Sequence, residues 1–324
     1  MRLLTALVAI LATLWGGYWF IGSSAVEKGA IQLLADIRAD GLEVNYSALG
    51  TRGFPNRFDT TISDPELTYL PNGIGWQAPF FKLFALSYRP NHLIALWPDT
   101  QRLILPQGVV DITTEDMRAS LVLEPDTGLA LDRSRLQIDT LSVTPESSAP
   151  TLVERAYLAT RQATARAFAH DLALEIEGIT LPADLRQQLD GSGHLPQRMS
   201  GLNIDATLQF NAPISLQDQL PKLTEITFRT AEARWDALSL GLSGTLKADN
   251  WGYAEGTLQL ESDNWRAVFE VLAETGLVDP VWEGAIEPLA NADGNPDTLN
   301  TSLRFANGTV YFGPLALGPS PRLN

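Results

Sequence analysis

Apolar and polar residues alternate in many short stretches of the chain after Gly41. The clearest stretch is residues 202–210, where single polar residues separate Leu202, Ile204, Ala206, Leu208 and Phe210. A period of two places the apolar side chains on one face of a β-strand and the polar ones on the other. The alternation recurs around residues 58–62, 136–138, 172–176, 238–242, 256–260 and 303–305. Gly, Asn, Asp and Pro separate these stretches, so the pattern predicts an antiparallel sheet of successive strands.

One segment of this body shows helical spacing instead. Between Thr151 and Ala167 the apolar residues are spaced 4, 3, 4 and 4, opposite three arginines, and Pro150 precedes them. This spacing predicts an amphipathic helix. No strand–helix–strand repeat of a parallel sheet is present, so we expect a mainly β fold with a few helices.

Two further helices are predicted. One runs from about Asn264 to Thr275, with Asp263 as its cap and Gly276 at its end. A short helix is expected from Asp184 to Leu189. The buried face of the longer one should consist of Trp265, Val268, Phe269 and Leu272.

The N-terminal segment is different, because residues 3–21 contain no charge. As a helix they would span ~28 Å, about the thickness of the hydrocarbon layer of a bilayer. Trp15, Tyr18, Trp19 and Phe20 gather at the far end, where aromatic rings favour the membrane interface, and Arg2 favours a cytoplasmic near end. We therefore predict a transmembrane anchor in residues 1–25, crossing the inner membrane through residues 3–21, and a periplasmic β-rich domain in residues 26–324.

A cleavable signal peptide is the alternative, because Ser23-Ser24-Ala25 offers small residues for a signal peptidase. The apolar run is, however, longer than the ~7–15 residues usual for a signal sequence. An apolar stripe also continues the helix toward Gly41, through Ala30, Leu33, Leu34 and Ile37. These observations favour a retained anchor.

Composition narrows the classes of function. The 23 Lys and Arg residues against 38 Asp and Glu residues give a net charge of −15, which disfavours nucleic-acid binding. The absence of cysteine excludes disulfides, thiolate nucleophiles and the usual zinc sites. Because 45 % of residues are hydrophobic, the chain should bury a core.

Candidate catalytic motifs are few. Gly241-Leu242-Ser243-Gly244 is shorter than the G-x-S-x-G elbow of serine hydrolases and lies among alternating leucines, which favours a strand. His92, His170 and His194 lack metal-ligand spacing, and we expect surface or loop positions for them. The loop of residues 190–194 lacks the Lys of a phosphate-binding loop.

Acidic residues suggest two weaker candidates for a functional site, a calcium loop and an acid–base pair. Residues 291–297 have oxygen ligands around Gly294, as a calcium loop does, but no glutamate follows to complete such a loop, so turns are favoured. Asp59 with Asp64 or Glu66 would make an acid–base pair, but Arg57 is two residues from Asp59 on one predicted strand, where an exposed ion pair is expected. We therefore expect no enzymatic activity, no cofactor and no metal.

Several motifs without periodicity resemble a known family. They are Arg52-Gly53-Phe54-Pro55-Asn56-Arg57-Phe58-Asp59, Ala85-Leu86-Ser87-Tyr88-Arg89-Pro90-Asn91-His92, Met117-Arg118-Ala119-Ser120-Leu121 and Asn307-Gly308-Thr309-Val310 with Gly313-Pro314-Leu315. They resemble the domain of unknown function 2125 family of proteobacterial envelope proteins, over nearly the whole chain. That resemblance implies no activity.

The layout is also similar to that of AsmA-like envelope proteins. This more remote resemblance implies a long curved antiparallel sheet, an AsmA-like trough, whose concave apolar face holds lipid acyl chains. It implies lipid binding or transport in envelope homeostasis, with a phospholipid or another acyl-chain lipid as partner and other envelope proteins as further partners.

Physical considerations agree with an apolar groove. About a dozen strands stacked at ~4.8 Å make a sheet on the order of 60 Å long, which a few helices cannot cover. The predicted lining residues are Leu202, Ile204, Leu208, Phe210, Leu238, Leu240, Leu258 and Leu260. The alternative is a structural or interaction module of the envelope with a closed β core and no ligand. Arg52, Arg57 and Arg89 would meet phosphate head groups or, as we expect more, carboxylates.

Overall fold

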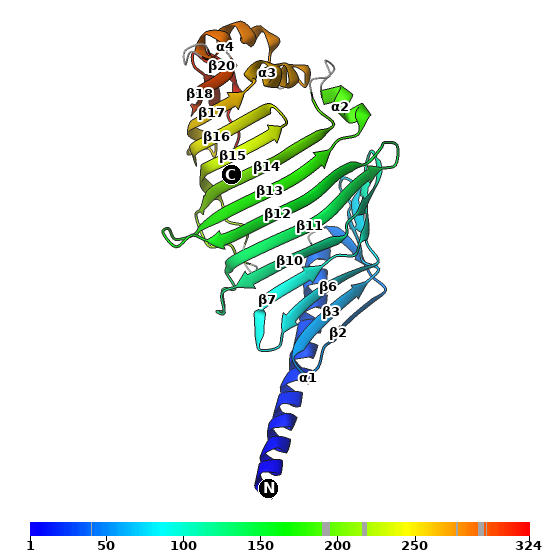
Figure 1. Cartoon of the computed structure of the whole chain (residues 1–324). Helices are drawn as coiled ribbons and strands as arrows, with labels where there is room; N and C mark the ends of the chain where they lie inside the picture. Colours follow the sequence, from blue (N-terminus) through cyan, green and yellow to red (C-terminus); the bar gives the residue numbers. More distant parts are fainter. Residues whose placement is uncertain (40, 190–194, 216–218, 277, 291–294, 296) are drawn as a thin grey trace. The chain divides into compact units, whose positions relative to one another are not determined.

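The computed structural model describes residues 1–39, 41–189, 195–215, 219–276, 278–290, 295 and 297–324. Within these residues it contains 20 strands, four α-helices and one short 3₁₀-helix (Figure 1). All strand pairs are antiparallel, and the sheet does not close on itself. The predicted mainly β fold with an open antiparallel sheet and an apolar N-terminal helix is confirmed, and the closed β core of the alternative is wrong. The chain divides into two compact units, Met1–Pro125 with Leu136–Ser147 and Asp126–Arg135 with Ser148–Asn324.

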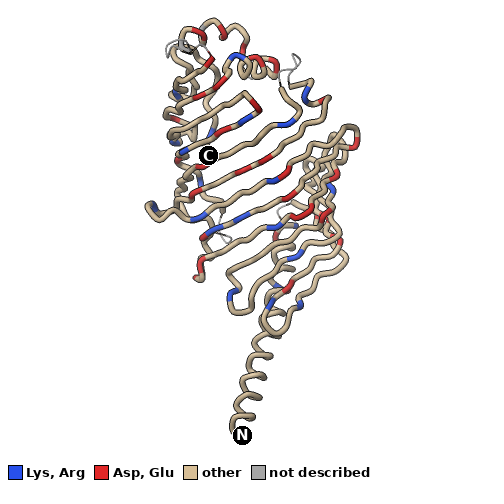
Figure 2. Tube along the Cα trace, viewed as in Figure 1, with Lys and Arg blue, Asp and Glu red and all other residues tan. Residues whose placement is uncertain are grey.

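Unit 1 begins with α1, a single helix over Arg2–Ala39. It continues without a break through Ala25 and ends just before Gly41, as the apolar stripe predicts. Side chains of its first half are almost all exposed, and Figure 2 shows this part largely without charge. Among the described residues α1 is the one helix long and apolar enough to cross a membrane.

The strands of unit 1 form two ladders between which the chain alternates. One ladder pairs β2 with β3, β6, β7 and β10 in that order, and the other pairs β1 with β4, β5, β8, β9 and the second part of β11. Val44, Phe58 and Val122 are among the buried apolar side chains. The bounds are β1 Leu42–Asn45, β2 Ala48–Arg52, β3 Arg57–Ser63, β4 Glu66–Tyr69, β5 Ile74–Gln77, β6 Phe80–Leu86, β7 Arg89–Leu96, β8 Thr100–Leu105, β9 Gly108–Thr113, β10 Asp116–Leu123 and β11 Leu131–Pro145.

Unit 2 is a meander in which each strand pairs with the next along the chain, from β12 to β20. Every alternating segment noted above lies in a strand, either here or in β3 and β11. The bounds are β12 Thr151–Gln162, β13 Ala169–Thr180, β14 Arg198–Phe210, β15 Leu223–Trp235, β16 Leu238–Ala248, β17 Ala254–Asp263, β18 Thr298–Ala306, β19 Thr309–Phe312 and β20 Leu315–Pro319.

Helices cover one end of this meander. The helices of unit 2 are α2 Ala183–Leu189, α3 Trp265–Glu274, the 3₁₀-helix η1 Pro280–Trp282 and α4 Glu283–Ala290. Trp265 and Phe269 of α3 and Ile286 of α4 form a buried cluster with Leu299 of β18 and Phe312 of β19. Figure 1 shows α3 and α4 at the end of unit 2 that carries β17 and β18.

The helix predicted between Thr151 and Ala167 is wrong, because most of this segment is β12. Across the ladder, Arg155 lies opposite Glu177 and Arg161 opposite Asp171, and both form ion pairs. The first interval of four, from Leu152 to Ala156, fits alternation as well as a helix, and pairing with β13 decides in favour of the strand. The last two alanines of the assumed stripe fall in the connection to β13.

The other helix predictions hold with small corrections. The short helix at Asp184 to Leu189 is confirmed as α2, and the helix from Asn264 to Thr275 as α3. The N-cap residue of α3 is Asn264 rather than Asp263, and the Asn264 side chain makes no capping hydrogen bond. Sequence analysis missed α4, an eight-residue helix with Pro288 inside it, because proline normally marks the end of a helix.

Candidate functional site

The apolar face of unit 2 is the candidate site that the sequence pattern predicts. Cross-strand pairing aligns its side chains in rows. One row runs from Ile176 through Leu202 and Ala233 to Leu240, and the next from Leu174 through Ile204 and Ala231 to Leu242. Each row crosses β13 to β16, so the alternation within single strands becomes a continuous apolar surface.

Burial divides this face into two regions. We call the part on β12 to β15 the open region, because its larger apolar side chains, among them Leu174, Leu202, Ile204 and Leu208, remain partly exposed. We call the part on β17 to β19, under α3, α4 and the C-terminal residues, the covered region. There Leu258 is only 4 % exposed and packs with Leu246 and Phe305.

The predicted groove residues are therefore split among three places. Leu202, Ile204, Leu208 and Phe210 are partly exposed residues of β14. Leu258 and Leu260 belong to the clusters of the covered region. Leu238 and Leu240 line a pocket where the open region meets α3.

This pocket has a volume of about 130 Å³. A dry cavity of roughly this size holds a benzene-sized apolar ligand. Val268 and Leu272, which belong to the predicted apolar face of α3, form one side of the pocket. The pocket lining as a whole is apolar except for Ser239. The remaining lining residues, which sequence analysis missed, are Leu195, Met199, Ala233, Trp235 and Val271. The alternation of Ala231, Ala233 and Trp235 could have indicated this apolar strand face, but alanine is only weakly hydrophobic, so the pattern is less clear than one made by leucines.

His170 lies at the edge of the open region, at the start of β13. The expectation of a surface or loop histidine is wrong here, because the side chain is 3 % exposed and packs edge-on against Phe210. Burial lowers the pKa of His170, and the carboxylates of Asp132 and Asp171 oppose that shift. Its Nδ1 has no hydrogen-bond partner within the described part of the chain.

The other two histidines differ from His170. His92 lies in strand β7, partly buried, with its Nε2 3.0 Å from Ser120 Oγ. His194 and the loop of residues 190–194 lie outside the described residues.

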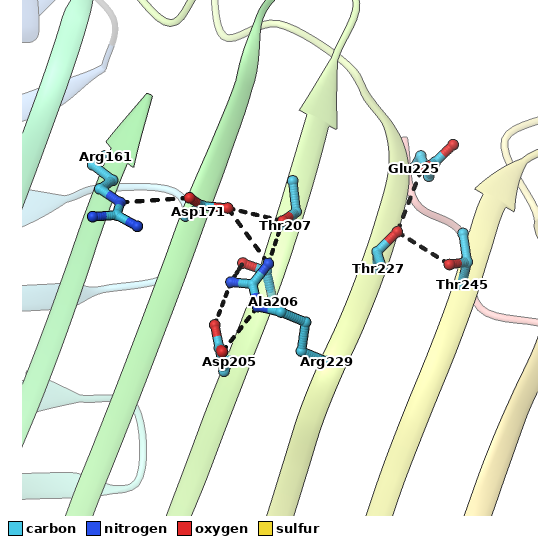
Figure 3. Close-up of polar contacts among 9 residues, drawn as sticks. All are labelled: Arg161, Asp171, Asp205, Ala206, Thr207, Glu225, Thr227, Arg229 and Thr245. Atoms are coloured by element: carbon cyan, nitrogen blue, oxygen red, sulfur yellow. Dashed lines mark hydrogen bonds and ion pairs between the residues drawn. The ribbon is translucent and has the colours of Figure 1, made fainter. Parts of the chain in front are cut away.

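The opposite face of the same strands is polar and internally paired (Figure 3). Arg229 of β15 binds both carboxylate oxygens of Asp205 and donates from Nη1 to Thr207 Oγ1 at 2.7 Å. Asp171 lies 3.5 Å from both Arg229 and Arg161. The guanidinium of Arg229 lowers the pKa of Asp205, and hydrogen bonding by Arg166 lowers that of Glu225. Ion pairs and hydrogen bonds thus join the side chains of this face, whereas the side chains of the open region are mainly apolar.

The family-like motifs near the start of the chain form two loops that contact α1. We call residues 53–58 and 87–90 the helix-contacting loops. Trp15 Nε1 donates to Pro55 O at 3.0 Å, Tyr18 Oη to Ser87 O at 2.6 Å, and Trp19 Nε1 to Arg57 O at 2.8 Å.

Two glycines allow this contact. A Cβ at Gly22 would lie 2.7 Å from the ring of Phe58, so only glycine lets that ring approach α1. Gly53 has φ +109, a backbone angle that favours glycine and explains why one precedes Phe54.

Of the acid–base candidates, Asp59 and Asp64 each have a different partner. Asp59 pairs with Arg57, as predicted for two residues on one strand face. Asp64 accepts a hydrogen bond from Ser47 Oγ at 2.6 Å. Gly241-Leu242-Ser243-Gly244 lies within strand β16, as predicted.

Candidate metal sites find no support in the part of the chain that the structure describes. No group of three or more His, Asp or Glu side chains there could hold a metal ion. Of residues 291–297, only Asn295 and Asp297 are described, and Asn295 Oδ1 accepts from the Asp297 backbone N–H at 3.2 Å. Whether the protein has an activity or a cofactor stays a prediction.

Comparison with known proteins identifies the family. A family model described as an uncharacterized protein conserved in bacteria (DUF2125) matches residues 19–321. The chain belongs to the DUF2125 family. This match includes Trp19, both helix-contacting loops and unit 2 as far as residue 321. No curated protein and no solved structure matches the chain, so the likeness to AsmA-like proteins stays a prediction.

Proposed function

We propose that this DUF2125 protein is anchored in the inner membrane by α1 and binds acyl chains of phospholipids or similar lipids on the open region of unit 2. It serves lipid binding or transport in the periplasm and catalyses no reaction. The observation that carries the proposal is the partly exposed apolar face whose rows of side chains lead into the pocket beneath α3.

The ligand chemistry follows from this surface. An acyl chain gains about 25 cal/mol for each Å² of apolar area removed from water, so 100 Å² contributes about 2.5 kcal/mol. The pocket wall has one polar residue, Ser239, and a hydrocarbon tail leaves no polar group of its own unpaired. The pocket holds only the end of a chain, and the rows crossing β13 to β16 offer a path for the rest.

The membrane arrangement rests on α1. An apolar helix of this length crosses the hydrocarbon layer, and Arg2 favours a cytoplasmic N-terminus. Units 1 and 2 then lie in the periplasm. The net charge of −15 keeps the body away from anionic head groups except where local structure compensates.

A single-cysteine pair tests acyl-chain binding on the full-length protein, because the chain has no cysteine of its own. Ile204→Cys places an environment-sensitive fluorophore on the open region, and Asn203→Cys places it on the opposite face of the same strand. Addition of a short-chain phospholipid below its micelle concentration should shift the Ile204 probe to the blue, saturably, and leave the Asn203 probe unchanged. Equal responses, or none, would contradict the proposal.

The same background tests the location of the body. Trp251 is exposed in unit 2, so Trp251→Cys should react with a membrane-impermeant maleimide once the outer membrane is permeabilised. Labelling only after the inner membrane is lysed would place the body in the cytoplasm and contradict the proposal.

A further inference from the structure

The two helix-contacting loops attach to α1 at an unexpected level. Their carbonyls accept hydrogen bonds from Trp15, Tyr18 and Trp19, all of which precede Ile21, the last residue of the uncharged stretch. Trp15 lies six residues before Ile21, which corresponds to about 9 Å along the helix axis. If residues 3–21 occupy the hydrocarbon layer, these loops reach its boundary beside the helix.

The side chains of the loops suit that environment. Phe54 is 57 % exposed although it packs against Trp19 and Phe20, with ring centroids 5.5 and 6.1 Å apart. Tyr88, in the second loop, is 59 % exposed. Phe20, whose ring stacks on Phe54, is exposed as well, and Tyr88 directly follows Ser87, whose carbonyl binds Tyr18 of α1. Aromatic rings are enriched at membrane interfaces.

The backbone carbonyls of the loops also have hydrogen-bond donors from the protein, as a water-excluded environment requires. Carbonyl oxygens cannot stay unpaired where water is excluded. The carbonyls of Pro55, Arg57 and Ser87 each receive an indole or phenol donor from α1. The two loops are joined by a hydrogen bond from Ser87 N–H to Asn56 O at 2.9 Å. A loop exposed to water would have no need of three aromatic donors.

Two arginines flank these exposed aromatic residues in the sequence. Arg52 and Arg89 are exposed, and neither forms an ion pair with any described residue, whereas Arg57 pairs with Asp59. In a chain with a net charge of −15, two unpaired cations beside two exposed aromatic rings fit lipid phosphates. This result partly revises the expectation that these three arginines meet carboxylates.

We propose that the helix-contacting loops form a second membrane contact, in which Phe54 and Tyr88 insert at the interface beside α1 and Arg52 and Arg89 bind lipid phosphates. The partner is the bilayer surface itself, because the contact is continuous with the membrane-spanning helix. The inference rests on the proposed membrane anchoring by α1. It assigns the Arg52 to Asp59 and Ser87 to His92 motifs a role in fixing unit 1 to the membrane.

Depth-dependent fluorescence quenching tests this contact on the full-length protein in nanodiscs that contain phosphatidylethanolamine and phosphatidylglycerol. Phe54→Cys and Tyr88→Cys each carry the fluorophore NBD, and Leu70→Cys is the control. Leu70 is 64 % exposed and lies after β4, away from these loops. Phospholipids with a spin label near the head group should quench positions 54 and 88 several-fold more than position 70, and aqueous iodide should show the reverse order.

Leu11→Cys, in the apolar part of α1, separates the two proposals. Position 11 is measured with a phospholipid that carries its spin label deep in the acyl chain. If this lipid quenches position 11 but positions 54 and 88 behave like position 70, the second contact is refuted while anchoring stands. If position 11 is also unquenched, anchoring by α1 fails and the second contact with it. Tyr88→Cys keeps the test valid if Phe54→Cys loosens the packing against Trp19. Replacing Arg52 and Arg89 by Gln should move the position 88 probe toward the aqueous phase.

Discussion

The covered and open regions of unit 2 are made from the same kind of strand but differ in how far their apolar side chains are buried. Leu258 of β17 and Ile204 of β14 both stand on the apolar face of an alternating strand. The first is buried in a cluster with Leu246, Phe305 and the C-terminal Leu323, and the second remains partly exposed. The comparison teaches that alternation decides which face is apolar, whereas elements elsewhere in the chain decide whether that face is sealed. The unsealed region is where we locate the ligand.

The largest difference is expected from a charge placed in each region. Leu246 of β16 packs against Leu258 of the covered region, so Leu246→Asp puts a carboxylate where the side chain is 5 % exposed, and several kcal/mol of desolvation cost should unfold unit 2. Ile204→Asp should leave the protein folded and abolish the lipid response of a probe at position 202. Circular dichroism and limited proteolysis check folding. Unfolding by both variants would show that the open region is a sealed core.

A milder matched pair sharpens the comparison. Leu258→Ala should lower the free energy of unfolding by about 2–5 kcal/mol, because it leaves a cavity among fixed neighbours. Leu202→Ala should cost about 1 kcal/mol, because a partly exposed leucine loses fewer contacts. Urea denaturation followed by tryptophan fluorescence measures both. Equal losses would remove the distinction between the regions.

His170 gives the open region a pH dependence. Burial lowers the pKa of His170 below the ordinary histidine value of about 6.5, so the folded state favours the neutral ring. The contribution of neutral His170 to the free energy of unfolding is complete above about pH 6.5. It is lost as the pH falls toward the lowered pKa, by at most about 1.4 kcal/mol per pH unit. His170→Gln should flatten this acid-side loss, and His92→Gln should not. Parallel pH profiles of wild type and His170→Gln would contradict the assignment.

The smallest effect is expected on the polar face. Arg229→Gln removes the two-point contact with Asp205, but both side chains are nearly half exposed, so the loss should stay below about 1 kcal/mol and shrink with added salt. The pKa of Asp205 should rise toward its ordinary value, which NMR titration detects. A loss above that of Leu258→Ala would mean that the ion-pair network, rather than the covered region, holds unit 2 together.

Local pattern was enough for seven of the 20 described strands, most of them in unit 2, and for two of the three predicted helices in the body. Residues 202–210 and 256–260 alternate so strictly that only a strand buries their apolar side chains on one face. The prediction for the stretch after Thr151 failed because the interval of four from Leu152 to Ala156 fits both periods, and because Arg155 and its strand partner Glu177 are far apart in the sequence.

The sites were less accessible to sequence reasoning. Trp235 and Val268 lie in one pocket because α3 folds back on β16, a contact that no local pattern encodes. The two ladders of unit 1 have strands as short as four residues, too short for a clear period. The contacts of Trp15 and Trp19 with the motif at Gly53 likewise depend on tertiary packing, although the aromatic cluster and the motif were each visible.

The central claim is that the open region holds acyl chains in the cell, and photo-crosslinking along β14 tests it most directly. A photoreactive amino acid is placed in turn at positions 202, 203, 204, 205, 207 and 208 of the full-length protein, and adducts are identified by mass spectrometry. The account predicts lipid adducts at 202, 204 and 208 and none at 203, 205 and 207, the period of the strand itself. Adducts of protein alone at the even positions, or lipid adducts without this alternation, would contradict it.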